Sequence, residues 1–129
     1  MRLLLDTHSV LWWLMDDPHL SPGARTAIAD PANQLLVSAA IGYELAYKQR
    51  LGRLPPAPEN LPRRLLKERI EVLPISLDHA LAAAALPGPH RDPWDRIMMA
   101  QAVAERCQVV TIDNSRARSS AARRLNLTM

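Results

Sequence analysis

The segment RLLLDTH at residues 2–8 decides the fold class of this chain. Three consecutive leucines between polar residues are typical of a short strand that is buried on both faces, as the strands of parallel sheets are. The run ends at a carboxylate, and the spacing of Val10, Leu11 and Leu14 predicts a helix directly after it. Because ligands of open α/β sheets bind beyond the carboxyl ends of the strands, Asp6 is the first candidate site residue.

Strands and helices alternate along the rest of the chain. Further strands are predicted at 34–37, 72–75, 108–112 and 125–128. Helices are predicted at 7–15, 22–29, 39–51, 60–71, 76–86 and 93–107. This alternation predicts a parallel sheet with helices on both faces, and 129 residues are the length of one domain.

Composition narrows the class of protein. The net charge is +3 and the pI is about 9.6, which permits an anionic partner, and 14 of the 16 basic residues are arginines. Codon bias in a GC-rich genome explains the arginine excess equally well. No apolar run approaches the ~20 residues of a membrane helix, and acidic residues interrupt the leucine-rich start, so we expect no membrane segment and no export. Cys107 is the single cysteine, and we expect a buried thiol in a reducing cytosol.

Two acidic residues follow predicted strands. Asp6 ends the first strand, and Asp113 ends the strand that contains Val109 to Ile112. Each has a structural alternative, which is a helix cap for Asp6 and an Asx-turn for Asp113. Two strands that both end in aspartate favour a shared site more than either does alone.

Two further acidic residues lie on predicted helices. Glu44 lies at the margin of an apolar stripe, where the alternative is an exposed ion pair with Lys48. Asp95 shares a helical face with Met98 and Met99, and a carboxylate on such a face needs a partner. The alternative is a role at the helix start, which we assign to Asp92 as the expected cap.

Four carboxylates that meet in one pocket would repel one another unless a cation balanced them. Oxygen ligands alone select Mg²⁺ or Mn²⁺, whereas Zn²⁺ prefers histidine or cysteine. Such an ion commonly serves phosphate chemistry, because it polarises the phosphoryl oxygen and activates a water molecule. The four histidines show no spacing typical of metal ligands, although His8 lies close enough to Asp6 in sequence to touch a substrate.

Five segments resemble the PIN-domain family, and in particular its VapC-type toxins of bacterial toxin–antitoxin pairs. They are LLLDTH at 3–8, SAAIGYELAYKQRLGRL at 38–54, LPISLDHA at 73–80, HRDPWDRIMMAQA at 90–102 and VVTID at 109–113. The segments cover nearly the whole chain in the family's order. The fourth is highly specific, whereas LLLDT alone would be weak.

The resemblance implies a single PIN-like domain over 1–129, with a three-layer α/β/α sandwich around a mainly parallel central sheet. It implies a Mg²⁺-dependent endoribonuclease, with Mn²⁺ as a plausible substitute. The implied catalytic and metal-binding residues are Asp6, Glu44, Asp95 and Asp113. Thr7 and Thr111 would hold these acids through their hydroxyl groups.

The same resemblance implies the partners. These are an RNA substrate, a cognate antitoxin whose C-terminal segment covers the acidic pocket, and a second copy of the chain in a homodimer, all in the cytoplasm. The sequence departs from the family at Gly42, which weakens the helix of Glu44, and in the segment after Asp113.

Three other readings compete. A haloacid-dehalogenase-like phosphatase also has an aspartate after its first strand, but it needs a second one two residues later, where this chain has His8. A receiver domain would need paired acids near the first strand. A catalytically inactive PIN-fold module that binds RNA or protein would have no use for the four acids.

Overall fold

The computed structural model describes residues 1–55, 60–88, 92–111 and 126–128. Its strands are β1 (Arg2–Leu5), β2 (Gln34–Ser38), β3 (Ile70–Leu73), β4 (Gln108–Thr111) and β5 (Asn126–Thr128). Its helices are α1 (Thr7–Leu14), α2 (Pro22–Ala29), α3 (Ala39–Arg50), α4 (Leu61–Lys67), α5 (Leu77–Ala85) and α6 (Pro93–Ala104).

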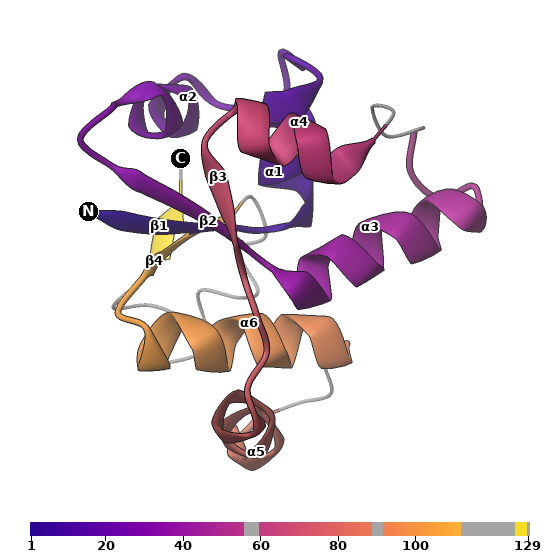
Figure 1. The fold of residues 1–129 in the computed structure, drawn as a ribbon, viewed down its shortest axis with the longest axis vertical. Coiled ribbons are helices and arrows are strands. Elements are labelled where there is room, and N and C mark those ends of the chain that lie inside the picture. The colour runs from indigo at the N-terminus through magenta and orange to yellow at the C-terminus, as the bar shows by residue number, and fades with distance from the viewer. Residues whose placement is uncertain (56–59, 89–91, 112–125, 129) are drawn as a thin grey trace.

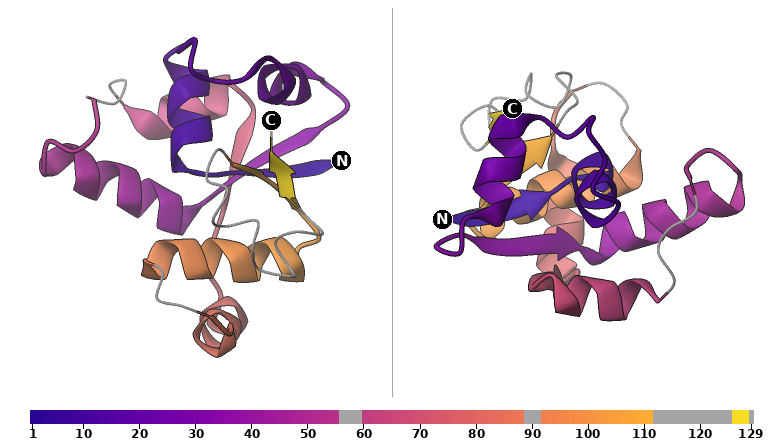
Figure 2. Two further views of the ribbon diagram at one scale, coloured as in Figure 1. Left: turned by 180° about the vertical axis from the view of Figure 1, so that it is seen from behind. Right: turned by 90° about the horizontal axis from the view of Figure 1, so that it is seen from above.

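The strands form one parallel sheet in the order β3-β2-β1-β4-β5. Helices α1, α2 and α4 lie on one side of it, and α5 and α6 lie on the other (Figures 1 and 2). The predicted α/β class and parallel sheet are therefore confirmed. Helix α3 extends from the carboxyl end of β2 toward the edge of the molecule (Figure 1).

The first strand occupies the centre of the sheet because it can be buried on both faces. Leu3, Leu4 and Leu5 are all 0% exposed, and β1 pairs with β2 on one side and with β4 on the other. Burial of each leucine stabilises the fold by about 1.5–3 kcal/mol. The residue that follows, Asp6, is consequently held at the carboxyl end of the central strand.

Serine side chains begin three of the helices. Ser21, Ser38 and Ser76 each accept a hydrogen bond from a backbone N–H in the first turn of α2, α3 and α5. The expected cap of α6 is wrong, because Asp92 precedes the helix but its side chain makes no capping hydrogen bond.

Two predicted helices are shorter than expected. The helix expected over 60–71 ends at Lys67, because Arg69 takes a left-handed conformation (φ 59°) and Ile70 pairs with β2. The helix expected to reach Cys107 ends at Ala104 for a similar reason, since Arg106 has φ 55°. Strand β3 lies at the sheet edge, where a proline directly after the strand (Pro74) is tolerated.

Cys107 is free and fully buried, as expected. Burial is the main reason that the pKa of its thiol is raised, so the thiol stays protonated at neutral pH. No helix within the described ranges is both long and apolar enough to span a bilayer.

Gly42 allows a test of how much this glycine lowers the stability of α3. A methyl group at this helical position would meet no atom within 4 Å, so Gly42→Ala should stabilise the protein by about 0.5–1 kcal/mol in urea unfolding. The matched control is Gly52→Ala just beyond the helix, where φ is +72° and alanine should cost roughly 1 kcal/mol or more. Destabilisation by Gly42→Ala would contradict the open space that the structure shows beside this position.

Candidate functional site

Asp6 links the central strand to the helix that follows it. Its Oδ1 accepts a hydrogen bond from the backbone N–H of Ser9 at 2.8 Å, so it caps α1. Its Oδ2 accepts from the hydroxyl of Thr111 at 2.7 Å, at the end of β4. The carboxylate is only 1% exposed, and these donors fix its orientation. The cap that we considered as an alternative to a site role is therefore present at the position where a site is expected.

The end of β4 is tied to the same place by its backbone. The N–H of Asp6 donates to the carbonyl of Val110 at 3.1 Å, and the hydroxyl of Ser9 donates to that same oxygen at 3.0 Å. Thr111 and Ser9 are buried at 1% and 0% exposure. Asp6 thus lies in a rigid junction of β1, α1 and β4.

Glu44 reaches the interior from α3. The Thr7 hydroxyl donates to Oε1, and the ammonium of Lys48 lies 2.6 Å from Oε2. The pair with Lys48 that we considered as an alternative is present, but it is not the exposed pair of that alternative, since Glu44 is 1% exposed. A buried carboxylate is costly without partners, and these two donors offset that cost.

Thr7 connects the two buried acids. It follows Asp6 directly in the chain, and its own side chain is 0% exposed and bonded to Glu44. Asp6 and Glu44 are therefore linked through Thr7, which is bonded to Asp6 in the chain and hydrogen-bonded to Glu44. In the sequence the two acids lie 38 positions apart.

Asp95 lies in the first turn of α6, where its backbone N–H donates to the carbonyl of Asp92 at 3.0 Å. This end of α6 faces α3, because the Trp94 ring lies 5.8 Å from the ring of Tyr43 (Figure 1). Asp95 and Glu44 are thus carried by two helices in contact. Asp113 lies outside the described residues.

Within the described part of the chain, no group of three or more acidic, histidine or cysteine side chains is arranged to hold a metal ion. Both oxygens of Asp6 and of Glu44 accept hydrogen bonds from protein groups. By donor type the acids still fit a hard divalent cation, because all of the ligands that they offer are carboxylate oxygens.

Sequence reasoning missed an aromatic cluster beside these acids. Tyr43 and Tyr47 stack on α3, and Trp94 of α6 lies next to both rings. The spacing of four residues between the tyrosines places them on one helical face and could have indicated the pair. Only the fold shows that Trp94 joins them.

Comparison with known proteins identifies the family. A family model described as PIN domain matches residues 3–120. The chain belongs to the PIN-domain family. The predicted likeness to VapC-type members is confirmed too, since this PIN domain is 34% identical over 113 residues to "Ribonuclease VapC22" of Mycobacterium tuberculosis, covering 86% of each chain.

Solved structures support the fold. One is the crystal structure of VapBC2 from Rickettsia felis bound to a DNA fragment from their promoter, with a TM-score of 0.71, 16% identity and coverage of 99% of this PIN domain and 98% of that chain. Another is a toxin–antitoxin complex from Klebsiella pneumoniae, with a TM-score of 0.64, 20% identity and coverage of 98% and 96%.

The bond between Thr7 and Glu44 can be tested by an isosteric change. Thr7→Val removes the hydroxyl that donates to a buried carboxylate, and we expect a loss of about 1.5–3 kcal/mol in the free energy of unfolding, measured in urea with EDTA. Thr26→Val is the control, because this exposed hydroxyl bonds only to a carbonyl of its own helix, and the change should stay within about 0.5 kcal/mol. Equal effects of the two changes would contradict the role of Thr7.

Proposed function

We propose that this PIN domain is a Mg²⁺-dependent endoribonuclease of the VapC type, which hydrolyses RNA phosphodiester bonds. The observation that carries the proposal is the junction of Asp6, Thr7 and Glu44, which holds two buried carboxylates together at the carboxyl edge of a parallel sheet. The activity class rests on family membership and on similarity to a protein named as a ribonuclease.

Each acid has a defined task in this proposal. Asp6, Glu44 and Asp95 hold the divalent ion, and Asp113 completes the set. When bound, the ion would polarise a phosphoryl oxygen and lower the pKa of a water molecule. The other polar residues keep the acids in position, because Thr111 and Ser9 fix Asp6 while Thr7 fixes Glu44.

Lys48 balances the charge of Glu44. The ammonium lies 2.6 Å from Oε2 of Glu44, so this buried carboxylate has a cationic partner of its own. In the proposal, Lys48 thereby helps to hold Glu44 in position for the divalent ion.

The proposal includes two protein partners, each supported by one observation. A cognate antitoxin neutralises the enzyme, in line with the toxin–antitoxin complex among the structural neighbours. A second copy binds through α5 and the edge strand β3, where apolar side chains are exposed. They are Leu77 (73%), Leu81 (61%) and Val72 (47%). We place the enzyme in the cytoplasm, where its RNA substrate is found.

Asp95→Asn tests the proposed activity. We expect the rate of RNA cleavage in Mg²⁺ to fall by at least ~100-fold, because the variant loses one ligand oxygen and its charge. Loss of a residue that only hydrogen-bonds a metal ligand already costs up to about 100-fold in activity. Initial rates on a labelled single-stranded RNA measure the effect. Asp92→Asn is the matched control, since this exposed residue precedes the same helix and makes no capping bond.

Three results would contradict the proposal. If Asp95→Asn cleaves RNA as fast as the parent protein, Asp95 does not take part in the site. Equal losses in both variants would point to damage at the start of α6. RNA binding without turnover by the parent in any divalent metal would favour the non-catalytic module.

A further inference from the structure

Three aromatic rings lie together where α3 meets α6. The rings of Tyr43 and Tyr47 stack with centroids 5.7 Å apart and planes inclined by 7°. The ring of Trp94 lies 5.8 Å from that of Tyr43 and 6.3 Å from that of Tyr47. We call these three side chains the aromatic platform.

The platform is more exposed than packing between helices requires. Tyr43 is 58% exposed and Tyr47 is 37% exposed. A ring pair of this spacing on a helix surface stabilises the helix by only about 0.2–0.5 kcal/mol. Contiguous exposed apolar surface more often marks a place where another molecule binds.

Each residue of the platform is the sequence neighbour of a charged residue at the candidate site. Tyr43 precedes Glu44, Tyr47 precedes Lys48, and Trp94 precedes Asp95. Successive residues of a helix lie about 100° apart around its axis, so the rings and the charged groups occupy neighbouring faces of the same two helices. A nucleic acid strand with a phosphate at the acids would therefore have its adjacent bases close to the rings.

We propose that the aromatic platform binds an unpaired base of single-stranded RNA by stacking, beside the phosphate that is cleaved. This inference rests on the proposed function and adds a subsite to it. Aromatic side chains bind bases in this way with little dependence on sequence, and each stacked base contributes about 1–3 kcal/mol.

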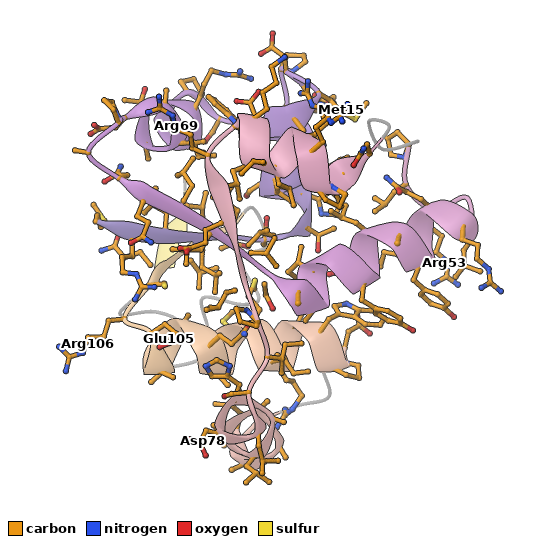
Figure 3. All side chains as sticks on the ribbon, in the orientation of Figure 1. Met15, Arg53, Arg69, Asp78, Glu105 and Arg106 are labelled. Carbon is orange, nitrogen blue, oxygen red and sulfur yellow. The ribbon has the colours of Figure 1, made fainter. Side chains whose placement is uncertain are left out.

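Charge around the platform complements an RNA backbone. The ammonium of Lys48 lies 5.9 Å from the centroid of the Trp94 ring. Arg50 and Arg53 are exposed at the far end of α3, and Arg53 extends away from the molecule (Figure 3). Because Lys48 is already paired with Glu44, the two exposed arginines are the cations that can attract the phosphates beside a stacked base.

A hollow of about 410 Å³ lies beside the rings. It is lined by Ala39, Ala40, Tyr43, Ile75, Pro93, Trp94 and Ile97. This volume is within the range of small-molecule sites, and its lining is mainly apolar, which suits the face of a base better than a phosphate.

Binding of RNA without cleavage is the direct test. The intact protein is titrated in EDTA and low salt against a fluorescently labelled single-stranded RNA, and anisotropy gives Kd. Tyr43→Ala and Tyr47→Ala should each weaken binding between about 5-fold and 160-fold. Tyr43→Phe and Tyr47→Phe keep the rings and should bind like the parent.

A further control separates the platform from the rest of α6. Val103 is 48% exposed and lies near the C-terminal end of α6, away from the platform. Glu105 and Arg106, which follow this end of the helix, are labelled in Figure 3. Val103→Ala should leave Kd unchanged. A loss equal to that of the tyrosine variants would contradict a local binding surface.

An abasic RNA of the same length distinguishes the base from the backbone. The parent should bind it more weakly than the intact strand, and the Tyr→Ala variants should bind it as the parent does. Equal losses on both strands would overturn stacking. Unchanged RNA binding, together with lost binding of the purified antitoxin or of a second copy, would overturn it in favour of a protein contact.

The outcomes for the two proposals can be told apart. Stacking that persists in a protein unable to cleave RNA in any divalent metal would defeat the proposed activity alone. Metal-dependent cleavage by a parent that binds intact and abasic strands equally would defeat the platform alone.

Discussion

The hydrogen bond from Thr7 to Glu44 joins two parts of the fold that the sequence keeps far apart. Thr7 begins the helix after the central strand, and Glu44 belongs to the helix after its neighbour β2. Both side chains are buried, so the bond cannot be exchanged for water without a cost of at least about 1–3 kcal/mol. Together with the hydrogen bond that the backbone N–H of Ser9 donates to Asp6, it fixes two carboxylates at one edge of the sheet.

Placing carboxylates in the interior lowers stability, and a structural role explains only part of their arrangement. A cap for α1 needs one oxygen of Asp6 at a helix start and does not need a buried partner on α3. Glu44 with Lys48 would stabilise α3 as well on an exposed face, without the desolvation penalty. The burial of both acids therefore agrees with a functional site in a PIN domain, where the loss of stability is offset by the chemistry that the carboxylates provide.

Local pattern predicted much of this structure. The leucine run of β1 and the alternation of strands and helices follow from short-range preferences, and the parallel sheet was predicted from them. The helix over 60–71 was wrong because pairing of Ile70 with β2 is a long-range contact that outweighs local helix propensity.

At the candidate site, too, local features were predictable and long-range contacts were not. Asp6 was predictable because strand ends can be read from the sequence. The burial of Glu44 was not, since it depends on how α1 packs against α3. The aromatic platform could not be foreseen for the same reason, because Trp94 meets Tyr43 and Tyr47 only when α6 lies beside α3.

The central claim is that Asp6, Glu44 and Asp95 converge on one divalent cation. Crystals of the protein soaked in Mn²⁺, a heavier substitute for Mg²⁺, test it directly through the anomalous difference map at the manganese edge. We predict a peak with at least one carboxylate oxygen of Asp6 and one of Asp95 within about 2.0–2.3 Å. Mn²⁺ bound elsewhere, or a map in which these two carboxylates lie too far apart to share one ion, would contradict the account.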